Sequence, residues 1–376
     1  MNQPSQNRLR EPPALSPARL IVSLTLSLTV LVIVAVYTFE PDQFEHLVGR
    51  IRAGWLLAAI GTVFLRVLFG GWRLAYASDG HLRLSDGIRA QLAWDFFSNV
   101  TPSAIGGAPA AAVYIARDRR VPLGQATAIM LFSVLLDHAM FTMCVVLLLI
   151  APIFMKVFPD AIGVVGGAAF GLLFVGLLVW LVLLVYAVLY RPEILETAAD
   201  RLFRLRFLRR FRARAMDEAR QLRHRAHLLR AKPTRFYLKG LGISLLLWLS
   251  RFALPLLIIR SVYVDVDSVL VFVRTMALSL GAVILPTPGG SGGIEGLYAL
   301  FLGPLMPATL VAPTLLAWRV LGYYLFLALG VYLSMHQVQQ SRWRSRRQVA
   351  SAPVESGDGD ARGAEKLAQP VPSRDG

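Results

Sequence analysis

Two short runs of glycine and proline are the part of this chain whose residue types and spacing best suit the binding of a ligand. They read TPSAIGG at 101–107 and TPGGSGG at 287–293, and each is surrounded by apolar sequence. Proline and glycine interrupt helices, and glycine lets a backbone amide approach a ligand closely. The amides at the start of the following helix carry partial positive charge and bind anions such as phosphate. We interpret both runs as candidate anion sites; the alternative is a tight turn that serves packing alone.

Ionisable side chains inside apolar sequence form the second candidate set. Such residues are costly in a membrane and usually face a cavity or a partner of opposite charge. Asp95 precedes the first run, Glu295 follows the second, and Asp137 lies in SVLLDHAMF beside His138. The arginines within apolar sequence are Arg66, Arg251, Arg274 and Arg319. The excess of cations favours an anionic headgroup; the alternative is structural ion pairing, for example of Asp137 with one arginine.

Five ionisable residues carry more specific expectations. Arg73 and Arg260 lie near the ends of apolar stretches, where a long side chain is expected to extend toward the lipid headgroups. Glu295 lies at the start of the helix after the second run, where its carboxylate would compete with a substrate headgroup for the free amides. Asp137, His138 and Glu295 are also the candidates for a proton relay.

The elements that must position these residues are membrane helices. Of the 376 residues, 56% are hydrophobic, which is too many for one soluble domain, and several stretches reach the length of a membrane span. The expected spans are 19–39, 54–76, 123–152, 162–190, 236–259 and 308–334. Two further apolar segments, 90–115 and 268–303, contain the two runs. Both breaks should face the protein interior, because irregular backbone is tolerated at membrane depth only where protein or a wet cavity surrounds it.

The distribution of charge predicts the orientation, because Lys and Arg collect on the cytoplasmic side of a membrane. The net charge is +16, and segment 191–235 alone holds fourteen Lys and Arg against five Asp and Glu. The N-terminus and the stretch after residue 335 are also basic. If all three are cytoplasmic, 90–115 enters from the cytoplasm and returns there, and 268–303 does the same on the outer side. Reading both segments as full spans is the alternative.

The predicted architecture is an all-α integral membrane protein with about six transmembrane helices, two re-entrant broken-helix hairpins and cytoplasmic termini. The two runs lie 186 residues apart, and their opposite directions are typical of inverted-repeat transporters with a site near the midplane. The predicted parts are the N-terminus 1–18, a first membrane half 19–190, a basic segment 191–235, a second half 236–334 and a tail 335–376. The basic segment suits an amphipathic helix on an anionic leaflet, and the tail is basic and then disordered.

The sequence resembles the lysylphosphatidylglycerol synthase transmembrane family, the flippase-like, UPF0104-type membrane proteins of bacteria. The stretches that carry the resemblance are SNVTPSAIGGAPAAAVYIARD at 98–118, LPTPGGSGGIEGLYALFL at 285–302 and LLAWRVLGYYLFLALG at 315–330. The residues that match the family motifs are Asn99, Pro102, Gly106 and Gly107 in the first, and Pro288, Gly289, Gly290, Gly292, Gly293 and Glu295 in the second. The family often has an acidic residue after the first Gly-Gly, where this chain has Ala108, which argues against a paired-carboxylate mechanism.

The resemblance implies a multi-pass protein of the bacterial inner membrane that moves a polar lipid between leaflets, without catalytic residues, metal or cofactor. The aminoacyl-transferring members carry a long soluble domain after the membrane part, and this chain is expected to be a standalone member without it. The expected partner is an anionic or modified polar lipid, and nucleic acid is not expected. Together with the motif residues, the candidate headgroup contacts are Asp137, Arg251, Arg274 and Arg319.

Two other functions remain open at this point. A non-transporting partner would hold a lipid-modifying or envelope-biosynthesis enzyme at the membrane, with segment 191–235 as its docking surface. An intramembrane protease would need Ser291 of GGSGG to be activated by His138, which would have to fold back. The sequence contains neither the phosphate-binding motif G-x-x-x-x-G-K-[ST] nor the zinc motif H-E-x-x-H. Its one cysteine, Cys144, excludes an intrachain disulfide and is expected to be a packing residue.

Overall fold

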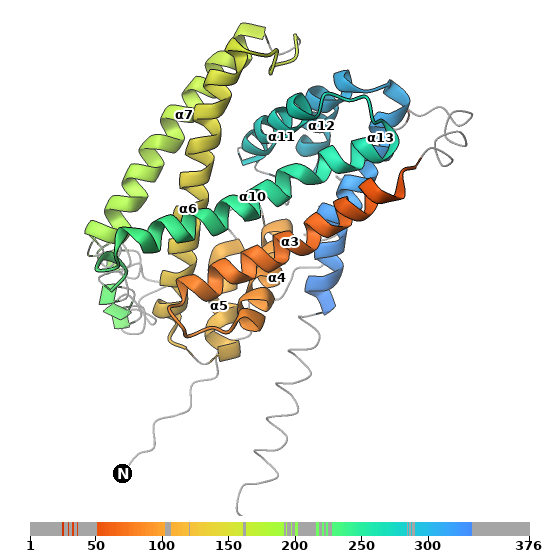
Figure 1. The fold of residues 1–376 in the computed structure, drawn as a ribbon. Helices are drawn as coiled ribbons and strands as arrows, with labels where there is room; N and C mark the ends of the chain where they lie inside the picture. The colour runs from red at the N-terminus through yellow and green to blue at the C-terminus, as the bar shows by residue number, and fades with distance from the viewer. Residues whose placement is uncertain are drawn as a thin grey trace, which may run out of the picture. The chain divides into compact units, whose positions relative to one another are not determined.

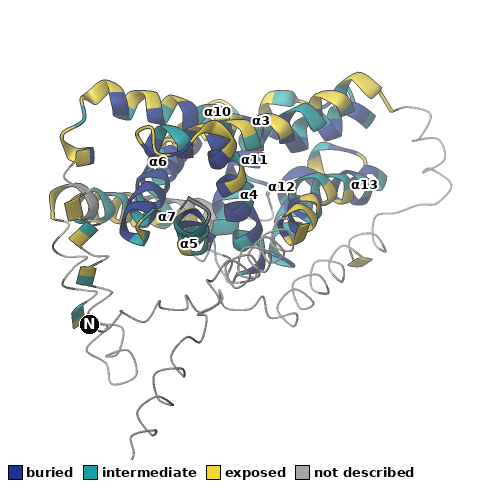
Figure 2. Cartoon of the chain, turned by 90° about the horizontal axis from the view of Figure 1, so that it is seen from below, coloured by how far each residue is buried: buried dark blue, intermediate teal, exposed yellow. Residues whose placement is uncertain are grey.

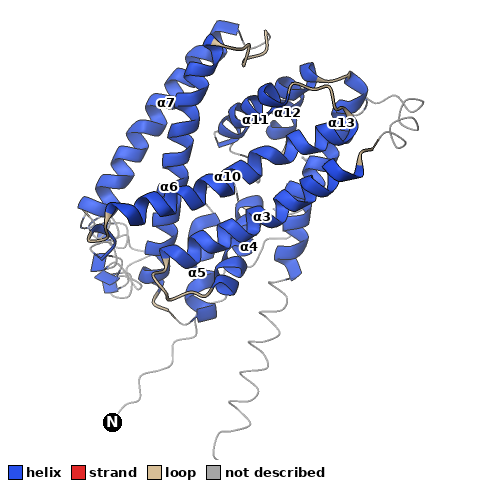
Figure 3. Ribbon diagram, in the orientation of Figure 1, coloured by secondary structure: helices blue, strands red, loops and turns tan. Residues whose placement is uncertain are grey.

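The computed structural model is helical in the part of the chain that it describes (Figure 3). The described residues are 51–101, 107–119, 121–160, 163–191, 228–283 and 290–332, with isolated positions at 25, 29, 32, 33, 36, 193, 197, 200, 201, 216, 217, 220, 221, 223, 224, 285 and 287. Contacts divide the chain into two units, Met1–Val331 and Tyr332–Gly376. The helices described below belong to the first unit, except for Tyr332 at the end of the last one.

Four helical stretches are long and apolar enough to cross a membrane, and they coincide with four of the predicted spans. They are α3 (Ala53–Ala77), α6 (Leu123–Ile150), α10 (Thr234–Val262) and a last stretch that begins as α13 (Ala308–Arg319) and continues through a π-helical turn (Val320–Tyr324) to Tyr332. α6, α10 and α13 each begin directly after a proline, because the first turn of a helix does not need the N–H that proline lacks.

A fifth apolar helix lies where the span 162–190 is predicted. It comprises α7 (Gly163–Val185) and a π-helical turn (Tyr186–Tyr190). The predicted span 19–39 lies outside the described residues, apart from five helical positions. Most of the basic segment 191–235 and the whole of the tail 335–376 also lie outside them.

Both glycine–proline runs interrupt helices, as the sequence predicts. α4 (Leu84–Val100) ends just before TPSAIGG, and α5 (Gly107–Arg119) begins at the closing glycine of that run. Likewise α11 (Ser268–Val283) ends before TPGGSGG, and α12 (Gly293–Leu302) begins at its last glycine. The first broken segment starts earlier than predicted. Its helix begins at Leu84 because the carboxylate of Asp86 accepts a hydrogen bond from the Arg83 amide at 3.1 Å and caps the N-terminus.

α3 and α10 pack side by side and run antiparallel (Figure 1). At one end the Arg52 amide donates to the Ser261 carbonyl at 2.8 Å, and at the other the Tyr76 hydroxyl donates to the Phe236 carbonyl at 3.2 Å.

α4 crosses α3 at a contact between glycines. A Cβ added to Gly87 of α4 would lie 2.1 Å from the carbonyl oxygen of Gly71 in α3. Small residues let membrane helices approach this closely. The crossing therefore holds α4 against α3 about two turns before Asp95.

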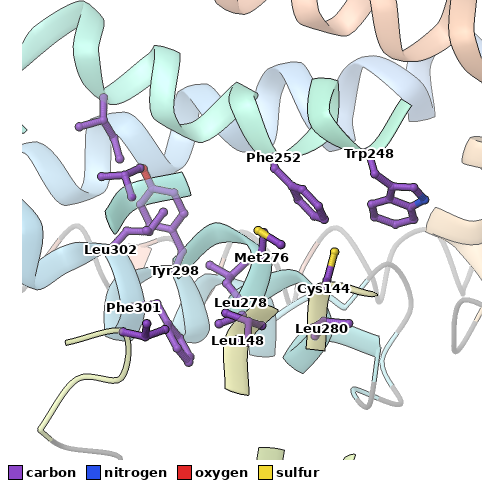
Figure 4. Packing of buried hydrophobic residues seen from close by; sticks show 14 of the residues in the cluster. Cys144, Leu148, Trp248, Phe252, Met276, Leu278, Leu280, Tyr298, Phe301 and Leu302 are labelled. Carbon is purple, nitrogen blue, oxygen red and sulfur yellow. The ribbon is translucent and has the colours of Figure 1, made fainter. Parts of the chain in front are cut away.

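The largest hydrophobic core joins α6, α10 and the α11–α12 pair. Trp248 and Phe252 point from α10 toward α11 and α6 (Figure 4). Their neighbours in this core include Met276, Leu278 and Leu280 of α11 and Cys144 and Leu148 of α6. Cys144 is 2% exposed, so it is the packing residue that the sequence predicts. The apolar side chains of Leu57, Phe64 and Leu246 are exposed, and Figure 2 shows exposed residues along α3 and α10, as expected where helices meet lipid.

Candidate functional site

The second break is organised around the N-terminus of α12. Gly290 and Gly292 have φ angles of +67° and +86°, which residues with a side chain rarely adopt, so this turn requires glycine at both positions. The Gly292 amide donates to Oε2 of Glu295 at 2.8 Å, and Glu295 is fully buried. The carboxylate of the chain itself therefore occupies the end of the helix at which anions bind.

Arg319 neutralises this carboxylate. Its Nε donates to Oε1 of Glu295 at 2.8 Å, and its Nη2 binds the same oxygen. Arg319 is 3% exposed, and its guanidinium lies 4.4 Å from the centre of the Tyr323 ring. A buried ion pair is tolerated only where further hydrogen bonds satisfy its atoms. Both Glu295 oxygens are satisfied here, one by the guanidinium and one by the helix amide.

Tyr323 connects the second break to the helix that precedes the first. The Ser291 hydroxyl donates to its oxygen at 3.3 Å, and its ring shares a buried cluster with Phe96, Val100 and Leu327. Val100 is the last residue of α4. Tyr323 lies in the π-helical turn of the last helix, and such turns are frequent at functional sites. Residues beside both breaks therefore pack around one aromatic side chain.

Arg274 lies at the opposite end of the α11–α12 pair. Its guanidinium donates to the carbonyl of Phe301 at 2.9 Å and to that of Lys156 at 3.0 Å. The last carbonyls of a helix lack intrahelical donors, so Arg274 caps the C-terminus of α12. Arg274 in the first half of α11 reaches the end of α12, and Gly281 near the end of α11 adjoins Leu297 nearer the start of α12. The two helices therefore run antiparallel, and their ends away from the break meet beside the loop after α6. Arg274 is thus placed away from the pair of Glu295 and Arg319.

The carboxylate of the first broken segment is Asp95 on α4. Its Oδ1 accepts from Arg66 Nη2 at 2.8 Å and from Arg251 Nη2 at 2.7 Å, and its Oδ2 accepts from Gln91 Nε2 at 3.2 Å. Arg66 also donates to the carbonyl of Gly322 at 3.3 Å, which lies in the π-helical turn beside Tyr323. Among the described residues, Asp95 pairs with two arginines, whereas Glu295 pairs with Arg319.

The described part of the first break packs tightly against α4. A Cβ added to Gly107 would lie 1.9 Å from Oγ of Ser98, so only glycine fits at this start of α5. The side-chain nitrogen of Asn99 is buried and has no hydrogen-bond partner in the described structure. Pro102, Gly106, Pro288 and Gly289 lie outside the described residues, so their expected role in anion binding stays a prediction.

A third buried carboxylate, Asp137 of α6, pairs with Arg73 of α3. The indole N–H of Trp248 donates to the same carboxylate oxygen at 2.7 Å. The alternative that Asp137 pairs with one arginine is therefore confirmed. The expectation that Arg73 extends toward the headgroups is wrong. Arg73 is 1% exposed, and its guanidinium lies 5.1 Å from the ring of Trp94. The carboxylate on the neighbouring helix holds it inside.

His138 takes part in different contacts from Asp137, because consecutive helical residues point in different directions. His138 Nδ1 lies 2.8 Å from the Val134 carbonyl, and its ring packs near Trp180 of α7. The hydroxyl of Ser291 bonds Tyr323 instead. Neither contact supports a Ser291–His138 dyad or a relay from Asp137 to His138.

Aromatic rings and the π-helical turn join the three carboxylates into one polar path. Trp248, which binds Asp137, lies 4.7 Å from the guanidinium of Arg251. Arg251 and Arg66 share Asp95, and Arg66 reaches the turn that directly follows Arg319. The path passes through six helical elements: α6, α10, α4, α3, the last helix and α12.

The structure brings together some of the predicted contacts and adds others. Glu295 and Arg319 form an ion pair at one end of the polar path, and Asp137 and Arg251 lie farther along it. Arg274 lies outside this path. Trp248 and Tyr323 are the additions. Trp248 lies three residues before Arg251, and Tyr323 lies four residues after Arg319. This spacing places each aromatic on the helix face of its arginine and is a signal that sequence can supply.

The fold and site define a helical membrane protein with two interrupted helical segments and ion pairs buried among its spans. The profile of the family described as "Lysylphosphatidylglycerol synthase TM region" matches residues 20–330, and the chain belongs to this family. The chain is also 21% identical, over 337 residues, to a "UPF0104 membrane protein" of Archaeoglobus fulgidus. That match covers 86% of this chain and 98% of the relative. The resemblance read from the two motifs is thereby confirmed.

Proposed function

We propose that this protein moves polar lipids, anionic or modified, between the leaflets of the bacterial inner membrane, along a seam formed by its two broken helices. Both termini would lie in the cytoplasm, and the two broken segments would be re-entrant hairpins of opposite direction. The antiparallel arrangement of α11 and α12, with their outer ends together beside Lys156, supports this topology for the second segment.

The observation that carries the proposal is the carboxylate of Glu295 at the N-terminus of α12. A helix N-terminus inside an apolar segment is a binding site for an anion, and here an internal anion fills it. A lipid phosphate carries the same kind of charge and the same acceptor oxygens. In the proposed mechanism a headgroup displaces Glu295 from the Gly292 amide and from Arg319, and the carboxylate returns when the headgroup leaves.

The packing around Tyr323 supports a seam between the breaks. Ser291 of the second break and the end of α4 both adjoin this side chain, and Ser291 and Glu295 are fully buried. Two hollows lie away from the breaks, against Gln125 at the start of α6. Because Ser291 and Glu295 are fully buried, a headgroup can reach them only if the side chains around them separate, and the Ser291–Tyr323 contact is one that would open.

A leaflet-exchange assay with purified protein in liposomes tests the proposal. Anionic and zwitterionic lipids are labelled in one leaflet, and wild type is compared with Gly290→Leu and Gly242→Leu. Gly290 has positive φ, so leucine strains the break. Gly242 lies on α10 with nothing near its Cβ position, so the same substitution there is a matched control. We expect exchange by wild type and Gly242→Leu, and slow exchange by Gly290→Leu.

Two outcomes would contradict the proposal. If folded wild-type protein exchanges no labelled lipid, the result favours a membrane partner of a lipid-modifying enzyme or a rarer lipid than those labelled, and co-purification from native membranes becomes the next step. If Gly290→Leu exchanges lipid at the wild-type rate, translocation does not use the second break.

A further inference from the structure

Resting on the proposed translocation, we propose that Arg66 and Arg251 form a binding site for the phosphate group of a lipid, which Asp95 occupies until the headgroup arrives. The site is separate from the N-terminus of α12. The ligand class is a phosphodiester carrying one negative charge.

Charge balance is the first argument. Two arginines meet the single carboxylate of Asp95, which is 3% exposed in its side chain. Glu295 and Asp137 each bind one arginine in the described structure. The Arg66–Asp95–Arg251 group therefore keeps one net positive charge. One phosphodiester supplies the charge that is missing.

Depth in the membrane is the second argument. Arg66 and Arg251 lie at least eleven residues from either end of α3 and α10, which is about 16 Å at the helical rise of 1.5 Å per residue. Their charged groups are therefore near the middle of two candidate spans rather than at a surface. A surplus cation at this depth is costly and indicates a substrate pathway.

Free hydrogen-bonding capacity is the third argument. A guanidinium has five N–H donors, and among the described residues Arg251 donates only from Nη2 to Asp95. The Nε atoms of both arginines are buried and find no partner in the described structure. The side chain of Arg251 is 28% exposed, against 12% for Arg66. Arg251 thus offers donors on an open side, in the fork geometry that binds two phosphate oxygens.

Aromatic rings hold both guanidinium groups in place. Arg66 lies 4.1 Å from the centre of the Phe326 ring, and Arg251 lies 4.7 Å from Trp248. Such contacts fix the orientation of a guanidinium without using its N–H donors. The donors are therefore oriented before a ligand binds.

A polar stripe on α4 leads from this site to the first break. Gln91, Asp95 and Asn99 are spaced by four residues and share one face of the helix. Gln91 Oε1 and Asn99 Nδ2 are both buried without a partner in the described structure. Asn99 lies one turn beyond Asp95 and directly before the break. A headgroup leaving the two arginines would find the amide donor of Asn99 on its way.

Lipid binding by purified full-length protein in detergent tests the site. The probe is fluorescent phosphatidylglycerol, and diacylglycerol with the same chains is the phosphate-free comparison. Arg251→Gln is the test variant and Arg260→Gln the matched control. Arg260 lies on the same helix, stacks on Trp55 at 4.4 Å and bonds Ser268. We expect Arg251→Gln to weaken phosphatidylglycerol binding about tenfold or more, as loss of a charge-assisted hydrogen bond does, and Arg260→Gln to bind as wild type.

Asp95→Asn gives a prediction of opposite sign. If Asp95 only supports the fold, the variant binds phosphatidylglycerol no better than wild type. If Asp95 occupies the site in place of phosphate, its removal raises the affinity for phosphatidylglycerol and leaves that for diacylglycerol unchanged. Should Asp95→Asn fail to fold, the comparison of Arg251→Gln with Arg260→Gln decides alone.

Further measurements distinguish a lipid phosphate from free phosphate, and distinguish failure of this inference from failure of the proposed lipid translocation. Displacement of phosphatidylglycerol by millimolar inorganic phosphate would assign the site to free phosphate and overturn a lipid ligand. Equal binding by wild type and Arg251→Gln would overturn the inference, while lipid exchange by wild type would leave the proposed function standing. Binding that follows the prediction, without any exchange in liposomes, would support the site and contradict translocation.

Discussion

The two breaks of this protein share a sequence motif but differ in their electrostatics. At the second, Glu295 and Arg319 balance each other, are almost fully buried and satisfy the N-terminus of α12. At the first, Asp95 lies on the helix before the break and faces two arginines, one of them partly exposed. No acid follows the first Gly-Gly, where Ala108 stands. At the second break the charges of Glu295 and Arg319 cancel, whereas the group of Arg66, Asp95 and Arg251 beside the first break keeps one net positive charge.

The difference shows that similar backbone irregularities can serve separate roles. The second break provides a helix terminus that an internal carboxylate blocks, which is suited to opening and closing. The first broken segment carries surplus arginine, which is suited to holding an anion. The π-helical turn lies between them, since Arg66 of the first group bonds Gly322 and Arg319 of the second directly precedes the turn.

Replacing one arginine at each break should give the largest difference in stability between two variants. Arg319→Gln leaves the carboxylate of Glu295 buried and unpaired, which costs about 3–5 kcal/mol of stability. Arg251→Gln leaves Asp95 paired with Arg66, so no buried carboxylate loses its last cation and the loss of stability should be clearly smaller. The apparent melting temperatures of both variants in detergent measure this difference. Equal losses would show that the two groups do not differ as described.

The support of the first segment can be tested at the α3–α4 crossing. Gly87→Ala forces a methyl group against the Gly71 carbonyl, and overpacking of this kind costs about 1–3 kcal/mol. Gly61→Ala on α3 has nothing near its Cβ position and should be neutral or slightly stabilising. Thermal unfolding of the two variants gives the measurement, and a neutral Gly87→Ala would rule out the close crossing.

The backbone of the second break gives a smaller effect. Gly290→Ala places a side chain at a φ of +67°, which costs about 1–2 kcal/mol. Gly242→Ala in α10 should instead stabilise the helix, by up to about 1 kcal/mol. The two melting temperatures should therefore shift in opposite directions, and shifts of the same sign would contradict the turn geometry.

The contact between the breaks should give the smallest change in stability. Tyr323→Phe removes the hydrogen bond from Ser291, which is worth about 0.5–1.5 kcal/mol, and keeps the ring against Val100. If this contact must open for a lipid to pass, the variant should exchange lipid faster than wild type. Slower exchange with unchanged stability would mean that the hydroxyl has another role in transport.

Sequence predicted the positions of the helices and both breaks well, because apolar length and Pro-Gly interruption are local signals. The span at 54–76 and the break at 101–107 are examples. Sequence also identified Glu295, which follows the run TPGGSGG, and Arg319, which lies in the stretch 315–330 that carries part of the family resemblance. The pairing of charges was less accessible, since it depends on which helices adjoin. Arg73 is near a helix end in sequence, yet α6 brings Asp137 beside it.

The different charge balance at the two breaks could not be predicted from sequence either, because it also depends on which helices adjoin. Asp95 acquires two arginines only because α3 and α10 run antiparallel against each other and both adjoin α4 or its side chains. Arg274 was expected to contact a headgroup because it is a cation in an apolar segment. In the structure its guanidinium instead donates to the carbonyls of Phe301 at the end of α12 and Lys156 in the loop after α6.

Reversible cross-linking of the second break tests most directly whether it forms part of the translocation seam. Cys144→Ala gives a cysteine-free background, because the chain has one cysteine. Leu285→Cys/Gly293→Cys closes the second break, since the Leu285 side chain comes within disulfide reach of a Cβ added to Gly293. Leu136→Cys/Gly240→Cys, which joins α6 to α10, is the control. We expect oxidation to stop lipid exchange in the break pair but not in the control, and reduction to restore it. Unchanged exchange in the oxidised break pair would contradict the account.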